Sequence, residues 1–234
     1  MKHKKEFSMN VFKKLWVSLK LCKEYIKVMP QLVVGAWKIT RLPQPVVSIF
    51  GGSKLKRTSK YVQWTEELSR NLVAHEISVL TGGGPGIMEA ANCGAFRKDF
   101  HPTHTMGIGI RDLPNEQSIN PCVKDYIITD YFPIRKFLLV QYSYAYVVFP
   151  GGFGTLDELA EVLTLLQTKK LPPAPVILIG QEYWAFFMQW VRRAVEEGLI
   201  TADHADYIRV TDNIDEATEI LVSYCRRCMH VDEA

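Results

Sequence analysis

From Val46 onward, short apolar runs alternate with longer segments in which apolar residues recur every three or four positions. The short runs predict β-strands, and the longer periodic segments predict α-helices. We expect strands at residues 46–50, 77–81, 105–110, 126–129, 145–149, 175–179 and 207–210, and helices at 61–75, 86–97, 133–143, 155–168, 182–197 and 213–227. Runs such as Val176–Ile179 are apolar throughout, which is typical of strands covered on both faces. The alternation therefore predicts an α/β fold, a Rossmann-like doubly wound parallel sheet.

A basic amphipathic helix is predicted ahead of this sheet, at residues 8–29. Its apolar positions keep a spacing of three or four and are Val11, Leu15, Leu19, Cys22 and Ile26. A second apolar stretch at residues 32–37 leads to Pro43 and Pro45, which mark the entry to the main domain. We therefore divide the chain into an N-terminal helical extension (1–42), a Rossmann-like domain (43–228) and a tail (229–234).

The apolar stripe of this N-terminal helix has two interpretations. It can pack on the main domain or on a second subunit, which we prefer, or it can lie on an anionic membrane surface. Basic residues crowd this end of the chain, at Lys2, Lys4, Lys5, Lys13, Lys14, Lys20, Lys23 and Lys27.

The overall composition suits one globular domain with a sizeable core, because 47% of the 234 residues are hydrophobic and 23% are charged. The net charge of +3 is too small to indicate binding to nucleic acid. No apolar run reaches the roughly 20 residues that a membrane-spanning helix needs, and lysines interrupt any signal-peptide core. We expect a cytoplasmic protein.

The five cysteines lack a regular spacing, which argues against a secreted disulfide framework. Cys225, Cys228 and His230 have a spacing that can indicate zinc, but no nearby residue supplies a fourth ligand. We interpret this segment as an ordinary frayed end of the chain and expect no bound metal.

Three of the predicted strands are followed by glycine-rich turns. The longest turn reads Pro-Gly-Gly-Phe-Gly-Thr-Leu-Asp-Glu at residues 150–158, and the others lie at 81–86 and 50–53. Glycine lets backbone N–H groups approach a ligand closely, and the start of a helix adds unpaired donors and partial positive charge. Such a turn can hold a phosphate. Because ligands of open α/β sheets bind at the carboxyl edge of the strands, we expect the three turns to share one crevice.

Glu158 ends the longest turn, where a bound phosphate would repel it unless it has another role. One alternative is structural, since Thr155 and Glu158 have the spacing of a capping box. The second glycine cluster, at residues 81–86, favours a ligand site instead.

Arg135 and Lys136 follow Pro133, which is expected in the first turn of a helix. Cations there oppose the helix dipole, and residues that break a local rule often mark functional sites. The alternative is a solvated basic surface.

An arginine, a phosphate cradle and a carboxylate together suit cleavage of an N-glycosidic bond in a phosphorylated sugar. The carboxylate would stabilise an oxocarbenium-like transition state or activate water, and the phosphate would anchor the substrate. The arginine would hold the phosphate or stabilise charge on the leaving base.

Three motifs, in this order and separation, resemble the Lonely Guy (LOG) family. They are Thr-Gly-Gly-Gly-Pro-Gly-Ile-Met-Glu-Ala-Ala-Asn at 81–92, Phe-Pro-Ile-Arg-Lys at 132–136 and the turn at 150–158. With its added N-terminal helices, the chain looks like the longer bacterial members. The resemblance implies a homodimeric, cofactor-free hydrolase with its nucleotide-binding, catalytic domain at 43–228. It would convert nucleoside 5′-monophosphates, such as AMP or cytokinin riboside monophosphates, to free base and ribose 5-phosphate.

By motif matching, the resemblance implies that Arg135 and Glu158 are the catalytic pair, and Glu116 matches a substrate-binding glutamate of the family more loosely. The other residues implied to bind substrate are Gly82, Gly83, Gly84, Lys136, Gly151, Gly152, Phe153, Gly154, Thr155, Leu156, Asp157 and Thr164. Two positions depart from the family pattern: Lys54 stands where longer members have an arginine after the first strand, and Asp157 stands where many have glutamate.

Three other activities fit the sequence less well. A non-catalytic nucleotide-binding sensor on the same fold is the main alternative, but a sensor does not need the pair of Arg135 and Glu158. A nicotinamide-dependent oxidoreductase is disfavoured, because the first strand lacks Gly-x-Gly-x-x-Gly and no acidic residue follows at the usual distance. LOG proteins are often labelled lysine decarboxylases, but no lysine here has a recognisable pyridoxal phosphate setting.

Overall fold

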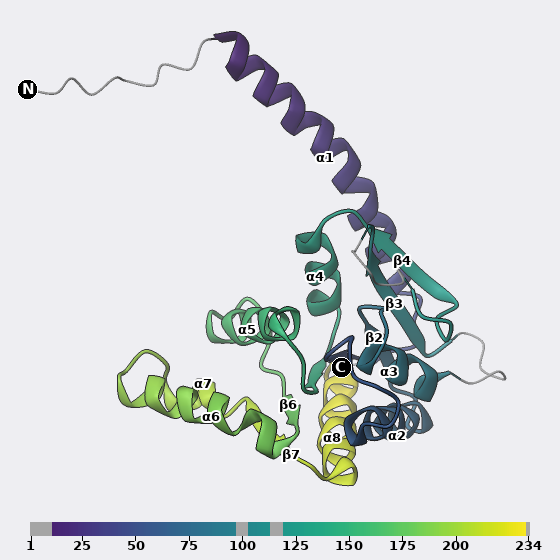
Figure 1. Ribbon diagram of the computed structural model, residues 1–234, viewed down its shortest axis with the longest axis vertical. Coiled ribbons are helices and arrows are strands. Elements are labelled where there is room, and N and C mark those ends of the chain that lie inside the picture. The colour runs from purple at the N-terminus through teal and green to yellow at the C-terminus, as the bar shows by residue number, and fades with distance from the viewer. Residues whose placement is uncertain (1–10, 97–102, 113–118, 233–234) are drawn as a thin grey trace, which may run out of the picture.

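The computed structural model describes residues 11–96, 103–112 and 119–232 (Figure 1). The strands are β1 (Val46–Phe50), β2 (Ser78–Thr81), β3 (Thr105–Ile110), β4 (Asp125–Thr129), β5 (Ala145–Val148), β6 (Val176–Ile179) and β7 (Ile208–Thr211). The helices are α1 (Val11–Ile39), α2 (Lys60–Ala74), α3 (Ile87–Ala95), α4 (Phe132–Gln141), α5 (Phe153–Gln167), α6 (Gln181–Glu196), α7 (Ala202–Ala205) and α8 (Ile214–Asp232).

All seven strands form one parallel sheet in the order β4-β3-β2-β1-β5-β6-β7. The chain builds outward from β1 to β4 and then returns to place β5 on the other side of β1. The predicted Rossmann-like doubly wound sheet is therefore confirmed. Ligands of such sheets bind where the strand order reverses, which is here between β1 and β5. At that point the N–H of Gly52 donates to the carbonyl of Pro150 at 2.9 Å, so two of the glycine turns meet.

Side chains alternate across each strand, and both faces of the sheet are covered. On β1, Val46 and Phe50 pack in a core with α4, α5 and α6, whereas Val47 and Ile49 pack in a second core with α2, α3 and α8. In Figure 1 these two groups of helices lie on opposite sides of the strands. The two layers explain why the central strands are apolar at almost every position.

The N-terminal segment is one continuous helix, α1, rather than the predicted helix at 8–29 followed by a separate apolar stretch. Pro30 lies inside it. A proline removes a helix hydrogen bond, but here the following turns are held against the main domain. Ile39 is fully buried in the core, and a Cβ at Gly35 would overlap the side chain of Leu138 on α4. Lys38 also donates to the carbonyl of Tyr126 at 2.9 Å. Packing on the main domain thus involves the C-terminal part of α1.

Other boundaries follow the sequence closely, with two exceptions. The short helix α7 has no sequence counterpart, and α8 continues to Asp232, so most of the predicted tail is helical. Cys93 and Cys122 form a disulfide that the spacing of the cysteines does not predict. Cys225 is buried, and this burial, together with the neighbouring Cys228, raises the pKa of its thiol to about 12. Among the described residues, none of the helices has the length and apolar character to cross a bilayer.

Candidate active site

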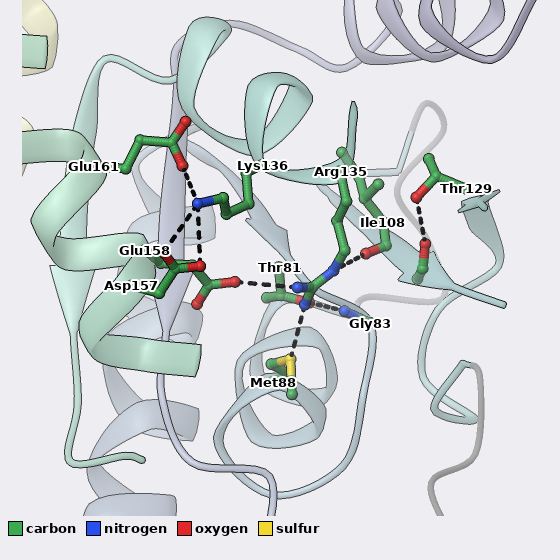
Figure 2. Close-up of polar contacts among 11 residues, drawn as sticks. Thr81, Gly83, Met88, Ile108, Thr129, Arg135, Lys136, Asp157, Glu158 and Glu161 are labelled. Atoms are coloured by element: carbon green, nitrogen blue, oxygen red, sulfur yellow. Dashed lines mark hydrogen bonds and ion pairs between the residues drawn. The ribbon is translucent and has the colours of Figure 1, made fainter. Parts of the chain in front are cut away.

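Arg135 reaches the centre of the candidate site from the first turns of α4, which begins at Phe132 with Pro133 in its first turn. Its guanidinium is held from three directions, as Figure 2 shows. Nε donates to the carbonyl of Ile108 in β3 at 2.8 Å, and Nη1 lies 3.2 Å from Oε1 of Glu158. Nη2 lies 3.9 Å from the Met88 sulfur. The side chain is only 12% exposed, so the alternative of a solvated basic surface is wrong for Arg135.

Glu158 projects toward Arg135 from α5. The helix begins at Phe153, so Glu158 is its sixth residue and lies in the second turn, not in the first turn as the motif suggests. The N-cap residue, which directly precedes the helix, is Gly152, and no side chain forms a capping hydrogen bond there. The capping-box interpretation of Thr155 and Glu158 is therefore wrong, because the helix starts too early for that role.

The electrostatic setting of Glu158 combines two opposing effects. Burial raises the pKa of the carboxyl group, and the charge of Arg135 counteracts this rise only in part, so the pKa remains above the ordinary value for glutamate. A raised pKa makes the ionised carboxylate a better proton acceptor. A buried carboxylate of this kind, in a site where the strand order reverses, is a typical candidate for a catalytic base.

Lys136, next to Arg135 on α4, lies against α5. Its amino group is 2.8 Å from Glu161 and 3.0 Å from Asp157. Burial of the amino group opposes its charge, but hydrogen bonds to these two carboxylates prevail and raise the pKa of Lys136. Lys136 therefore stays charged and ties α4 to α5, which fixes the distance between the two helices that carry Arg135 and Glu158.

The glycines at 82–84 follow β2 and pass directly beside Arg135. A Cβ at Gly82 would overlap Nη2 of Arg135, so only glycine leaves room for the guanidinium. Gly83 has a φ of 72°, a conformation that favours glycine. The loop is held from below by a residue that sequence reasoning missed: the buried Asn120 donates to the carbonyls of Gly83 and Gly84 at 3.0 and 3.1 Å.

Asn120 belongs to a small buried polar network. Its side-chain amide also donates to Asn92 at 2.9 Å, and Asn92 accepts a bond from Thr81 at 2.7 Å. Asn92 ends the glycine motif at 81–92, so its place in that motif was a usable signal. For Asn120 the sequence offered no such signal.

The turn at 150–154 is open to ligand. The positions where a Cβ would stand on Gly152 and Gly154 have no neighbouring atom within 4 Å among the described residues, and Phe153 is 92% exposed. Gly151, by contrast, packs against Thr155, which is buried. The unpaired N–H groups at the start of α5 are thus available to an anion within one helical turn of Glu158.

Not all of the predicted substrate-binding residues gather at this centre. Leu156 and Thr164 lie further along α5 and line a cavity of about 340 Å³ between α5 and α6, together with Phe187 and Trp190. Glu116 lies outside the described residues. The arrangement that the structure does bring together is a buried arginine–carboxylate pair, a glycine loop packed on the arginine and an open helix N-terminus.

Comparisons with known proteins agree with this picture. A family model described as "Possible lysine decarboxylase" matches residues 88–221, more than half of the chain. The cytokinin riboside 5′-monophosphate phosphoribohydrolases LOG3 and LOG1 of Arabidopsis thaliana are each 28% identical to it. The LOG3 match covers 76% of this chain and 82% of that protein, and the LOG1 match covers 77% and 84%. The molybdenum cofactor carrier protein of Chlamydomonas reinhardtii has a similar fold, with a TM-score of 0.56 and 22% identity over 77% of this chain and 98% of that one.

Proposed function

This chain belongs to the LOG family, and we propose that it is a hydrolase that cleaves the N-glycosidic bond of nucleoside 5′-monophosphates to free base and ribose 5-phosphate. The observation that carries the proposal is the contact between Arg135 and Glu158, buried at the point where the strand order reverses. A protein that only binds nucleotides has no need to bury a carboxylate with a raised pKa beside its ligand. AMP and N6-modified adenosine monophosphates are the substrates we propose.

The phosphate would bind first to the backbone N–H groups of residues 152–154, at the start of α5. Anchoring the phosphate there would place the ribose over the next turn of the helix, near Glu158. The binding energy of this remote group would then hold the reacting C1′ atom in position.

Glu158 would act on the ribose in its ionised form. As the bond from C1′ to the base nitrogen breaks, positive charge develops on the sugar, and a nearby carboxylate stabilises it. The same carboxylate would accept a proton from the water whose oxygen attacks C1′, and the departing base would take up a proton. Arg135 would hold Glu158 in place through the 3.2 Å contact and would stabilise negative charge on the leaving base.

The other site residues would bind rather than react. Gly82–Gly84 would leave space beside Arg135, and Gly151–Thr155 would surround the phosphate, with Leu156 and Asp157 as further proposed substrate contacts. Lys136 would hold α4 and α5 at a fixed separation through its ion pairs with Asp157 and Glu161. Glu116 and Thr164 remain proposed substrate contacts.

We also propose that the active form is a homodimer built on the face of α5 and α6. Leu156 and Trp190 line the 340 Å³ cavity there and are exposed, as are Phe153 on α5 and Phe186 on α6. Large exposed apolar patches are typical of protein interfaces.

A chromatographic assay tests the proposal. Purified protein is incubated with AMP, with an N6-isopentenyl derivative of AMP, and with CMP, GMP and UMP, and the released base and ribose 5-phosphate are quantified. We expect release from at least one purine monophosphate and none from the matching nucleoside, because the nucleoside lacks the anchoring phosphate. Binding of a monophosphate without release would support the alternative of a non-catalytic sensor.

A further inference from the structure

The first half of α1 stands clear of the main domain. Figure 1 shows the helix extending from the body, next to α4 and β4, into open space. Every described side chain between Lys13 and Lys27 is exposed, and contact with the body begins only at Val28. Large apolar side chains exposed together on one helix indicate a partner surface.

One face of α1 is an uninterrupted apolar stripe. Its members follow one another at intervals of four and three residues and therefore share a face of the helix; they are Leu15, Leu19, Cys22, Ile26, Met29 and Val33, which we call the α1 stripe. All of them are exposed, and Leu15, Leu19, Ile26, Met29 and Val33 are each more than half exposed. In the last turns of α1 a different face, with Val28, Leu32 and Ala36, packs on the main domain. The stripe is thus left free even where the helix is docked.

Positive charge accompanies the α1 stripe. Residues 11–29 contain five lysines, at positions 13, 14, 20, 23 and 27, against one acidic residue, Glu24. Lys13, Lys20 and Lys27 recur every seven residues and so lie together on the side of the helix away from the α1 stripe, as the charged face of an amphipathic helix does. Trp16 and Tyr25 are also exposed. The amino group of Lys20 lies over the Trp16 ring, 5.5 Å from the ring centre. Lysines on a polar face with Trp and Leu beside them are typical of helices that lie in a membrane interface.

A second copy of the chain is the competing occupant, since intervals of three and four residues also suit a coiled coil. Pairing two copies through the α1 stripe would leave Lys13, Lys20 and Lys27 on the outer sides of the helices, with no oppositely charged group supplied by the partner. An anionic bilayer instead supplies both the apolar layer for the stripe and negative charge for the lysines. The charge of α1 therefore favours the membrane.

We propose that α1 is a peripheral membrane anchor. The α1 stripe inserts at the boundary between headgroups and acyl chains of an anionic bilayer, and the lysines contact the lipid phosphates. The helix lies in the plane of the surface and does not cross it. This role is independent of the activity proposed for the site at Arg135 and Glu158.

Flotation of the full-length protein with lipid vesicles tests the proposal. We expect binding to phosphatidylcholine vesicles that contain phosphatidylglycerol, little binding to phosphatidylcholine alone, and weaker binding at high salt. The triple variant Lys20→Gln, Lys23→Gln, Lys27→Gln should bind roughly 100-fold more weakly, since each lysine near an anionic surface contributes about a factor of five. The double variant Leu19→Glu, Ile26→Glu should also lose binding by at least about 100-fold, because charge would replace the inserted apolar groups.

Two control variants carry the same kinds of change away from α1. Lys169→Gln with Lys170→Gln removes charge from an exposed loop, and Leu199→Glu changes an exposed apolar residue after α6. Both should bind anionic vesicles as the unchanged protein does, and circular dichroism should show that all variants are folded.

Three results would overturn the proposal. The first is no binding of the unchanged protein to anionic vesicles, and the second is binding that the double variant retains. The third is an effect of the double variant on oligomer mass alone, measured by light scattering, which would assign the stripe to a second copy of the chain.

Discussion

The guanidinium of Arg135 and the carboxylate of Glu158 lie 3.2 Å apart, although strand β5 separates α4 and α5 in the chain. Only 12% and 11% of the two side chains are exposed. A buried ion pair is costly to break, because removing one partner leaves an uncompensated charge. Each residue therefore depends on the other, and conservative substitutions are the informative ones.

Replacing Glu158 with glutamine keeps the shape of the side chain and one acceptor for Arg135 but removes the negative charge. If the carboxylate stabilises the transition state or activates water, kcat should fall by about 10²–10⁴-fold while AMP binding is retained. Turnover and binding are measured by chromatography and calorimetry. Glu196→Gln, on the exposed end of α6, is the control and should change neither. Full activity of Glu158→Gln would leave Glu158 with a structural role only.

Replacing Arg135 with lysine keeps the charge but loses the planar fork. A lysine has one amino group and cannot reproduce the contacts that Nε and Nη1 make with Ile108 and Glu158. We expect kcat/KM for AMP to fall by about 10²–10³-fold with the fold intact. Unchanged kcat/KM would show that positive charge alone is sufficient at this position.

The pH dependence of turnover reports on the buried carboxyl group. An ordinary glutamate has a pKa of about 4.3. Burial raises the pKa of Glu158 above its usual range, so this group takes up a proton at a higher pH than an ordinary glutamate does. Activity that requires the carboxylate should therefore be lost, as pH falls, at a pH above that value. The profile should be measured as kcat under saturating AMP, because the free substrate phosphate itself titrates near pH 6. An acidic limb at or below the ordinary value would contradict the prediction.

Gly82→Ala tests the packing of the glycine loop on Arg135. The added methyl group would overlap Nη2, which is the movable end of a long side chain, so the guanidinium should shift while the fold survives. We expect stability to change by less than about 1 kcal/mol but kcat to fall by about 10²-fold, since a small displacement of a catalytic group has a large effect. Urea unfolding and the AMP assay give the two values. A large loss of stability with normal kcat would reverse the interpretation.

Asn120→Ala tests the support beneath that loop. The substitution removes the side-chain donor to the buried carbonyls of Gly83 and Gly84 and to Asn92, while the Gly83 carbonyl keeps its bond from the backbone N–H of residue 120. The free energy of unfolding should fall by about 1–3 kcal/mol, measured by urea denaturation. Gln63→Ala, on the exposed side of α2, should change it by less than about 0.5 kcal/mol. Equal stability of the two variants would mean that another donor replaces Asn120.

Much of the architecture could be predicted because it depends on local patterns. Apolar runs and helical spacing gave the order of the elements, and each observed strand begins and ends within one residue of its expected range. The glycine turns marked the carboxyl ends of the strands. Arg135 stood out because a cation occupied a helix start, where the helix dipole disfavours it, and Glu158 because it stood beside a turn suited to a phosphate, which would repel it. The resemblance to the LOG family matched both to motifs.

Contacts between distant residues were decided only by the tertiary structure. The start of α5 at Phe153 sets the phase of the helix, and that phase turns Glu158 toward Arg135 instead of toward the helix start. Asn120 beneath the glycine loop and the continuity of α1 through Pro30 likewise depend on what packs against them. The sequence determined which groups are present and which strands and helices carry them, because secondary structure follows from neighbouring residues. Which side chains meet follows from how those elements pack, and only the folded chain fixes that.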